Sequence, residues 1–410
     1  MFKSPRGTND ILPKDWQYWN YVISKAENIA QFYNYERIET PVIEDSNLFL
    51  RSIGENTDIV EKEMYIFPDH SGDNLSLRAE GTAPVCRAYL EHGLHNSSHP
   101  LRLYYISSMF RYDRPQAGRY RQFHQFGIEL IGEEDYSADF EIIEFAIKYL
   151  ETLGLTKIKL LINNIGDLED REKYIADLKE YFKNHSNSFN AEDRKRFEEN
   201  PLRLLDSKSI DFEQFVDIPQ SINYLNDTAR LHWENLLKQL DRFKISYTID
   251  PKLVRGLDYY NRTVFEIHPT TDGTQTAIIA GGRYDGLIEQ LGGKPTPAIG
   301  FATGIERILL NLHKNDIHPI DTIKELWLVA YLGIEAKTEA IKISNYLREN
   351  KQISVLAPNR SLKSQMRYAS AINATKVIII GDEELKNSTI IIKDMKTGDQ
   401  NTIPMRKLTF

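Results

Sequence analysis

Residues 101–130, LRLYYISSMFRYDRPQAGRYRQFHQFGIEL, indicate the fold more clearly than any other stretch of the chain. Two runs rich in apolar and aromatic residues, 101–112 and 122–130, are separated by a polar, arginine-rich connection that contains Pro115 and Gly118. Two β-like runs joined in this way predict an antiparallel hairpin with a long basic loop.

The second run of this hairpin has two different faces. Successive side chains of a strand point to opposite sides of the sheet, so Phe126, Ile128 and Leu130 share one face. Gln125 and Glu129 share the other face, with a glycine between them. We expect the apolar face to pack on the core and the polar face to form the floor of a pocket.

The connection carries a high density of positive charge. Arg111, Arg114, Arg119 and Arg121 lie within a few positions of one another, beside Gln116. Their guanidinium groups would repel one another unless an anion joined them, and a triphosphate or a nucleic-acid backbone would suffice. The alternative is a solvated charged loop.

A second informative stretch is RGLDYY, residues 255–260, which precedes a strand-like run over 263–267. Arg255 keeps its charge at any working pH, and its planar fork of donors suits carboxylate and phosphate oxygens. Together with the adjacent Tyr259 and Tyr260 it predicts a pocket for an anionic and aromatic ligand. A surface turn with an ordinary arginine is the alternative.

Residues 77–82, LRAEGT, place Glu80 and Thr82 just before a predicted helix over 83–90. Glu80 could receive an ammonium group. Thr82 could either bind a ligand or cap the helix.

Glycines mark two other stretches. Residues 298–309, AIGFATGIERIL, connect a strand to a helix through Gly300 and Gly304, with Arg307 one turn into the helix. This arrangement allows the backbone to approach a flat ligand closely. In residues 281–287, GGRYDGL, the paired glycines indicate either a close approach of this kind or a tight turn.

The remaining pattern predicts an α+β protein. Apolar residues at helical spacing predict an amphipathic helix over 16–35. The short strand that follows, 36–40, is confined by Pro41 to a sheet edge or a subunit interface. The charged, helical texture of residues from about 167 to 247 predicts an insertion between two halves of an antiparallel sheet that is flanked by helices.

We expect two domains, 1–320 and 325–410, joined by a polar linker after Leu312 that contains Pro319. In the second domain strands alternate with helices, which predicts a compact α/β domain with a largely parallel sheet. A hairpin around 396–398 completes it.

The composition excludes several classes of protein. With 41% hydrophobic and 27% charged residues, the 410-residue chain is typical of soluble globular proteins. No apolar run approaches the roughly 20 residues of a membrane span, and MFKSPRGTND lacks the apolar core of a secretion signal, so a cytoplasmic location without membrane contact is expected. The single Cys86 excludes an internal disulfide, and the ten histidines show no metal-ligand spacing, so no metal site is expected.

The charge is unevenly distributed along the chain. The net charge is −8, but residues 322–410 carry 14 Lys+Arg against 9 Asp+Glu, which is 14 − 9 = +5. A basic segment on an acidic body is compatible with a domain that contacts phosphates, although scatter in a solvated surface gives a similar bias.

In combination these stretches resemble a known family. The edge strand with Pro41, the arginine hairpin and the glycine strand followed by Arg307 resemble, in that order, the three motifs of class II aminoacyl-tRNA synthetases. LVRGLDYYNRTVFE (253–266) and GGRYDGL resemble the two signature peptides of the histidyl-tRNA synthetase family. The resemblance runs from PRGTNDILP (5–13) to the final domain, which is similar to class IIa anticodon-binding domains.

The resemblance implies which residues bind ATP and act in catalysis. Arg111 would hold the α-phosphate and Arg307 the terminal phosphates, with Arg119 and Gly304 completing the ATP site. Arg255 would contact the α-phosphate and the substrate carboxylate as a fixed cation. Arg255 and Arg111 are therefore the predicted catalytic residues.

The resemblance also implies the histidine and tRNA sites. The ammonium end of the amino acid would be bound by Glu80, Thr82 and Gln125. The two imidazole nitrogens would be bound by Glu129 and Tyr260. Tyr259 and Tyr284 would line the pocket. Arg114, Gln116 and Arg121 would contact the acceptor end of the tRNA.

The implied activity is that of a histidine-tRNA ligase. L-histidine would react with ATP, carried with Mg²⁺, to give histidyl-adenylate and pyrophosphate, and the histidine would then pass to the 3′ end of tRNA(His). A homodimer is also implied. One departure is Ala79, where the family usually has proline, and we expect it to leave the activity unchanged.

Two other functions compete with this interpretation. A non-catalytic, synthetase-like regulatory subunit of ATP phosphoribosyltransferase shares the catalytic fold but typically lacks the C-terminal domain and has degraded signature peptides. A class II synthetase for another amino acid is the second, which RGLDYY disfavours.

Overall fold

The computed structural model describes residues 2–54, 57, 59–116, 118–183, 189–190, 193–194, 197–198, 201–205, 210, 215, 217–270, 277–319 and 325–408. The chain forms two compact units, Met1–Pro319 and Ile320–Phe410, each of which has its own sheet and core.

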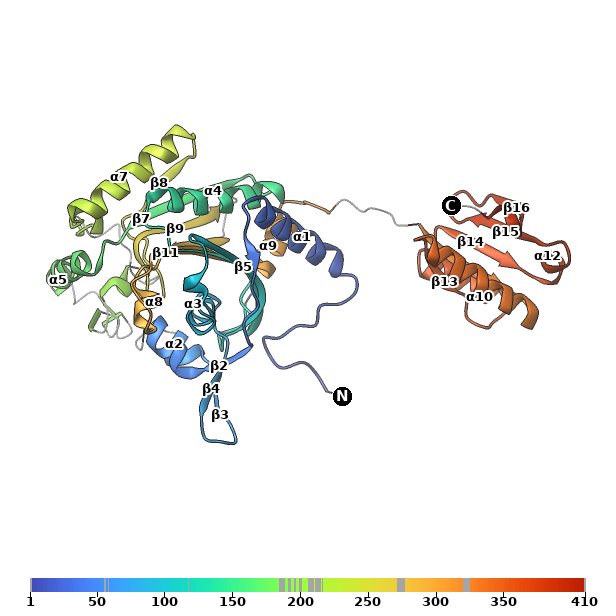
Figure 1. Ribbon diagram of the computed structural model, residues 1–410, viewed down its shortest axis with the longest axis horizontal. Helices are drawn as coiled ribbons and strands as arrows, with labels where there is room; N and C mark the ends of the chain where they lie inside the picture. The colour runs from blue at the N-terminus through green and yellow to red at the C-terminus, as the bar shows by residue number, and fades with distance from the viewer. Residues whose placement is uncertain are drawn as a thin grey trace. The chain divides into compact units, whose positions relative to one another are not determined.

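The first unit is built around an eight-stranded sheet with the order β1-β5-β6-β11-β10-β9-β7-β8 (Figure 1). Its strands are β1 (Glu36–Arg37), β5 (Leu101–Phe110), β6 (Gln122–Ile131), β7 (Ile158–Asn164), β8 (Tyr247–Ile249), β9 (Asn261–Pro269), β10 (Ile279–Arg283) and β11 (Ala298–Gly304). All neighbours are antiparallel except the two outermost pairs, β1 with β5 and β7 with β8. The predicted antiparallel sheet and its central hairpin are therefore confirmed. The strand β1 lies at a sheet edge, one of the two predicted places, but it ends at Arg37, three residues before the predicted boundary.

Four helices cover one face of this sheet: α1 (Trp16–Phe32), α4 (Tyr136–Thr152), α7 (Asp227–Arg242) and α9 (Ile305–Lys314). Figure 1 shows α4 and α7 running alongside the sheet, and α1 packs on α4 and α9. The side chains of Phe126, Ile128 and Leu130 are buried in this core, as their alternation predicts. The helix α1 ends three residues before the predicted boundary, because Asn34 takes a left-handed conformation (φ 58°) that turns the chain into β1.

The other face of the sheet is only partly covered. The helices α2 (Ser46–Ile53), α3 (Thr82–Glu91) and α8 (Leu287–Gln290) pack there, with a small sheet of β2 (Ile43–Asp45), β3 (Ile66–Pro68) and β4 (Asn74–Leu77) and the short helices η1 (Ile59–Glu63) and η2 (Leu94–Asn96). Between β7 and β8 the described elements are helical: α5 (Leu168–Lys183), η4 (Pro201–Leu204), η6 (Ser221–Asn223) and α7. Tyr174, Leu178 and Phe182 of α5 give this insertion a core of its own.

The second unit is a five-stranded sheet with the order β13-β12-β14-β15-β16. Its strands are β12 (Leu326–Tyr331), β13 (Ile353–Leu356), β14 (Lys376–Ile380), β15 (Thr389–Asp394) and β16 (Gln400–Pro404), and its helices are α10 (Ile334–Glu349), α11 (Leu362–Ala371), α12 (Asp382–Lys386) and η7 (Met405–Lys407). Only the pairs of β12 with β13 and β14 are parallel. The expectation of a largely parallel sheet is therefore only half right, because the final hairpin adds two antiparallel pairs.

Candidate active site

A cavity of about 650 Å³ opens on the face of the large sheet opposite the main core. Its floor is formed by β6, β11 and β10, and its walls by the RGLDYY loop, the basic hairpin loop and the start of α3. A cavity of this size fits a nucleotide together with a small acid, since ligand pockets commonly span about 300–1,000 Å³.

Small residues keep the middle of this floor flat. Ala280 of β10 and Gly300, Ala302 and Gly304 of β11 all line the cavity. A Cβ atom at Gly300 would lie 2.0 Å from Oε2 of Glu129, so only glycine lets that carboxylate cross the neighbouring strand. The floor can therefore receive a flat ligand.

The paired glycines of GGRYDGL lie in strand β10 and not in a turn. A Cβ at Gly281 would meet the carbonyl oxygen of Gly300 at 2.3 Å, and one at Gly282 would meet the carbonyl oxygen of Thr263 at 2.7 Å. The tight-turn alternative is wrong, because both glycines serve the close approach of neighbouring strands.

Glu129 is fully buried and does not itself line the cavity, but its hydrogen-bond partners Thr82 and Tyr284 line one end of it. Its Oε1 accepts a hydrogen bond of 2.7 Å from the Thr82 hydroxyl, and its Oε2 accepts one from the Tyr284 hydroxyl. Burial raises the pKa of Glu129 from 4.5 to about 8, against the opposing effect of these two hydrogen bonds. The carboxyl group can therefore hold or release a proton near neutral pH.

Glu80, the second acid here, caps α3. Its oxygens accept 2.7 Å hydrogen bonds from the backbone N–H groups of Thr82 and Ala83. Thr82 is therefore not the cap, because its hydroxyl is directed to Glu129 instead. Burial raises the pKa of Glu80, while the two backbone hydrogen bonds oppose that shift.

Three tyrosines and a glutamine complete this end. The ring of Tyr259 lies 4.7 Å from that of Tyr260 and 5.8 Å from that of Tyr284, measured between centroids. Burial raises the pKa of Tyr259 and of Tyr284 well above the ordinary value, so both hydroxyls stay protonated. The Oε1 atom of Gln125 is buried and accepts no hydrogen bond from the described residues, so it is free to receive a donor from a ligand.

Four arginines line the other end of the cavity: Arg111, Arg119, Arg255 and Arg307. Arg111 Nε donates to the Ala79 carbonyl at 2.8 Å, and Arg307 Nη1 donates to the Ala277 carbonyl at 3.0 Å. Burial lowers the pKa of Arg307, and the charges of Arg119, Arg111 and Arg255 lower it further. An anionic ligand would relieve this repulsion.

Ala79, the departure from the family pattern, is fully buried beside α2. It does not line the cavity, but its carbonyl accepts the hydrogen bond from Nε of Arg111, which does. Proline has the same carbonyl, and an unchanged activity stays a prediction.

The three hairpin residues that were predicted to contact tRNA, Arg114, Gln116 and Arg121, do not line the cavity. Arg114 and Gln116 are exposed at the tip of the hairpin. The guanidinium carbon of Arg121 lies 3.7 Å from the centre of the Tyr112 ring, and its backbone N–H donates to Gly7 at 2.7 Å. These residues form a separate basic surface next to the arginine end of the cavity.

Sequence reasoning missed several residues that position this site. The ring of Tyr105, on β5, lies 2.3 Å from where a Cβ of Gly81 or of Gly127 would be, so these two glycines make room for it beneath the carboxylates. The glycine between Gln125 and Glu129 was the available signal. Arg255 Nη1 forms an ion pair with Glu266 of β9. That glutamate lies within the signature peptide, but nothing in the linear pattern links it to Arg255.

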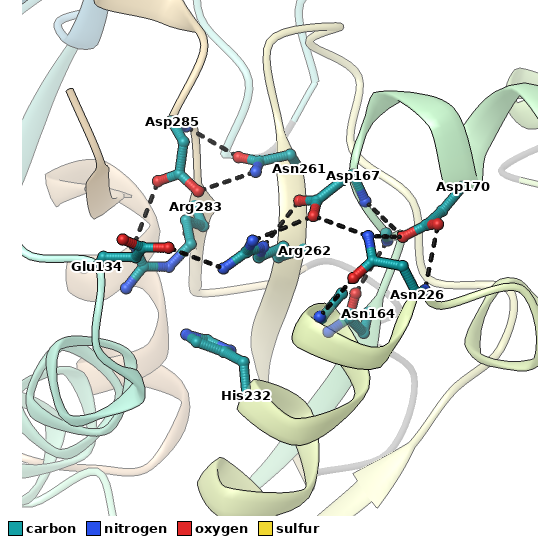
Figure 2. Close-up of polar contacts among 12 residues, drawn as sticks. Glu134, Asn164, Asp167, Asp170, Asn226, His232, Asn261, Arg262, Arg283 and Asp285 are labelled. Carbon is teal, nitrogen blue, oxygen red and sulfur yellow. Dashed lines mark hydrogen bonds and ion pairs between the residues drawn. The ribbon is translucent and has the colours of Figure 1, made fainter. Parts of the chain in front are cut away.

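A buried polar network joins the two signature peptides (Figure 2). Asn261 exchanges two 2.9 Å hydrogen bonds with Asp285. Arg283 donates to Asp285 at 3.2 Å and pairs with Asp139, and both members of the pair with Asp139 are fully buried. Arg262, whose φ is 46°, forms an ion pair with Asp167 at the start of the helical insertion.

The insertion also holds the RGLDYY loop directly. Arg171 of α5 donates through Nη1 to the carbonyl oxygen of Tyr260 at 2.9 Å and of Asp258 at 3.3 Å. Tyr259 and Tyr260 therefore lie on a loop that hydrogen bonds from α5 hold in place, and such support is what precise placement of a ligand requires.

Comparison with known proteins agrees with this geometry. A family model for histidyl-tRNA synthetase matches residues 7–308, and one for the anticodon-binding domain matches residues 327–409. A curated histidine–tRNA ligase from Dehalococcoides mccartyi is 48% identical over 410 residues, covering 100% of this chain and 98% of the relative. One from Thermosipho melanesiensis is 46% identical over 403 residues, covering 98% and 96%.

Solved structures give the same result. A crystal structure of apo S. aureus histidyl-tRNA synthetase matches with a TM-score of 0.83 and 38% identity, covering 100% of this chain and 98% of that chain. A Bacillus halodurans protein described as an ATP phosphoribosyltransferase regulatory subunit/histidyl-tRNA synthetase shares the fold with a TM-score of 0.68, but at 24% identity. The comparisons favour the synthetase over the regulatory subunit.

The antiparallel sheet, the arginine cluster and the separate anticodon-binding unit define a class II aminoacyl-tRNA synthetase, an ATP-using ligase. Since a family model covers most of the chain and a full-length relative is 48% identical, the chain belongs to the histidyl-tRNA synthetase family. The predicted fold class and enzyme class are confirmed. Within the described residues, no helix has the length and apolar character that crossing a membrane requires.

Proposed function

We propose that this chain activates L-histidine with ATP and transfers it to tRNA(His). The observation that carries the proposal is one cavity with two chemically distinct ends. The buried Glu80 and three tyrosines line one end, where Glu129 is bonded to the lining residues Thr82 and Tyr284, and four arginines with a flat strand between them line the other. Such a cavity suits an amino acid placed against a nucleotide triphosphate.

We assign the carboxyl end to histidine. Gln125, Glu80 and Thr82 would bind the ammonium group, and the unpaired Gln125 Oε1 is a ready acceptor. Glu129 and Tyr260 would pair with the two imidazole nitrogens, between the rings of the other two tyrosines, Tyr259 and Tyr284. A side chain without these nitrogens would leave Glu129 and the Tyr260 hydroxyl without the partners that histidine supplies, which is a basis for rejection.

We assign the arginine end to ATP. Arg111 would hold the α-phosphate, and Arg307 with Arg119 the terminal phosphates, while the base and ribose lie over the strand that ends at Gly304. In the described residues no three acidic, histidine or cysteine side chains gather as a metal site. Mg²⁺ would therefore be held chiefly by the nucleotide's own phosphates, where it would neutralise charge on the leaving pyrophosphate.

In the first step an oxygen of the histidine carboxylate attacks the α-phosphorus in line. A new O–P bond forms, the bond to the β-phosphate oxygen breaks, and pyrophosphate leaves. Arg255 and Arg111 stabilise the charge that develops on the α-phosphate. In the second step the terminal hydroxyl of tRNA attacks the acyl carbon and AMP leaves. The protein acts by positioning and charge stabilisation, without a side-chain nucleophile.

The tRNA would contact two separate surfaces. Arg114, Gln116 and Arg121 are placed to meet its acceptor end beside the arginine end of the cavity. In residues 325–410, which we assign to anticodon binding, Lys363 and Arg367 are exposed one turn apart on α11. We assign activation to residues 1–320.

We also propose a cytoplasmic homodimer. Val42 and Ile43, which follow Pro41, are 42% and 47% exposed, and Ile66 on the same small sheet is 48% exposed. A second copy could cover these apolar side chains. Sedimentation of the full chain, compared with a variant that carries Ile43→Asp, would test the dimer.

The test of the activity is ATP–pyrophosphate exchange with a panel of amino acids at saturating ATP and Mg²⁺. Exchange should depend on histidine and on no other amino acid. Absence of exchange with histidine would overturn the proposal and would favour a non-catalytic role. Exchange with another amino acid would overturn the assignment of the pocket.

A further inference from the structure

The catalytic candidate Arg255 is held by a carboxylate that the reaction scheme above does not use. Glu266 lies on β9, opposite Ala280 of β10, and Ala280 lines the cavity. Its Oε1 accepts a hydrogen bond from Arg255 Nη1 within an ion pair, and both side chains are only 18% exposed. A pair shielded to this degree is less weakened by solvent than a surface pair.

The second oxygen of this carboxylate also has a fixed partner. Nε2 of His268 lies 2.7 Å from Oε2 of Glu266. His268 is two residues further along β9, so it lies on the same face of the strand. Burial opposes ionisation of Glu266, but the hydrogen bond from His268 and the charge of Arg255 together lower its pKa. The carboxylate is therefore charged and cannot rotate without losing a partner.

This anchoring leaves at least one donor of the Arg255 guanidinium, Nε, without a partner in the part of the chain that the structure describes. Arginine has five N–H donors in a rigid plane, so fixing one arm orients the others. Arg255 Nε is buried and has no hydrogen-bond partner among the described residues. The guanidinium carbon lies 5.7 Å from the centre of the Tyr260 ring, which limits movement on that side. Donors without acceptors at this position would be satisfied by phosphate or carboxylate oxygens.

We propose that Glu266, supported from behind by His268, is a positioning residue that presents Arg255 to the reacting α-phosphate and carboxylate. This inference rests on the proposed histidine activation. It differs from a purely stabilising ion pair in one respect: removing the carboxylate should slow the chemical step through Arg255, and should have little further effect once Arg255 is gone.

The first experiment compares Glu266→Gln with the parent chain in histidine-dependent ATP–pyrophosphate exchange. Glutamine keeps the shape but loses the charge, so kcat should fall on the order of 10- to 100-fold, the range that follows from a small misplacement of a catalytic group. KM for histidine should change much less. Glu141→Gln is the matched control, because Glu141 pairs with Arg102 at similar exposure outside the cavity, and it should leave kcat unchanged.

The second experiment distinguishes positioning from stability. Arg255→Ala and the double variant Arg255→Ala/Glu266→Gln should have about the same kcat, because the glutamate acts only through the arginine. Added guanidinium, at a non-denaturing concentration, should partly restore exchange to Arg255→Ala but not to the double variant, which lacks the carboxylate that would bind it.

Several results would overturn the positioning role. They are an unchanged kcat in Glu266→Gln, losses that multiply in the double variant, and equal rescue of both variants by guanidinium. If Glu266→Gln does not fold, His268→Phe decides the question, since it should lower kcat several-fold at a similar KM and an unchanged kcat would overturn the role. A parent chain without exchange would overturn the proposed function itself, and this inference with it.

Discussion

Replacing Glu129 by glutamine is expected to make the ligand-free chain more stable at neutral pH while it removes histidine activation. The carboxyl group is fully buried, and its pKa is raised from 4.5 to about 8. The folded chain therefore keeps this proton up to about pH 8, whereas the unfolded chain releases it above pH 4.5. Stability is lost as the pH rises between these two values.

The size of this loss follows from the two pKa values. Each pH unit between the two pKa values lowers the free energy of unfolding by about 1.4 kcal/mol. The loss amounts to roughly 3 kcal/mol at pH 7 and about 5 kcal/mol at pH 8 and above. The glutamine variant does not lose this stability, because its amide does not ionise. Its mismatched hydrogen bonds to the two hydroxyl donors lower the free energy of unfolding by about 1 kcal/mol at every pH. The melting entropy of the 319-residue unit is about 0.7 kcal/mol/K, so 3 kcal/mol corresponds to about 5 °C.

The assay is calorimetric melting of the parent and of Glu129→Gln from pH 5 to pH 8.5. The melting temperature of the variant, relative to the parent, should rise by several degrees over this range. Saturating L-histidine should narrow the difference, because an imidazole N–H pairs with the ionised carboxylate of the parent alone. A difference that stays constant with pH, or that grows toward acid, would refute the reasoning about Glu129.

Four further outcomes are expected. Arg255→Ala should lower the activation rate constant about 10²- to 10³-fold in exchange assays, with a much smaller change in the histidine KM, and equal rates would remove it from the mechanism. Gly300→Ala should abolish measurable histidine binding by calorimetry, because its methyl group would meet a pocket carboxylate, whereas Gly286→Ala, where a Cβ meets open space, should bind normally. Arg283→Met should destabilise the first unit by about 3–5 kcal/mol in denaturant unfolding, since it leaves a buried carboxylate unpaired. A chain ending at Pro319 should retain exchange and lose tRNA charging, and retained charging would count against a tRNA role for the second unit.

Local patterns predicted much of the fold because they depend on neighbouring residues. The alternation around Glu129 separates a core face from a pocket face, and strand β6 shows both. Pro41, which lacks a ladder donor, predicted an edge position for the strand before it, and β1 has that position although it already ends at Arg37. Helix boundaries and strand directions were harder to predict from the sequence. The left-handed Asn34 ends α1 early, and the last hairpin adds antiparallel pairs to the second sheet.

Side-chain partners were the least predictable part of the site. The sequence indicated Thr82 as a ligand or a cap and Glu80 as a ligand, whereas packing makes Glu80 the cap of the helix and directs Thr82 to Glu129. The pairing of Arg255 with Glu266 depends on how the RGLDYY loop folds back over β9. Residue type cannot specify such a return of the chain.

The sequence by itself determined the kind of chemistry: arginines for anions, tyrosines and carboxyl groups for a polar aromatic ligand, and glycines for a flat floor. These properties belong to the residues and to their immediate neighbours. Only the tertiary structure brought Arg111, Arg119, Arg255 and Arg307 to one cavity and left Glu129 buried, with a raised pKa, against two residues of the cavity wall. Mutual repulsion and desolvation act through space, so they arise only when strands far apart in the chain meet in one sheet.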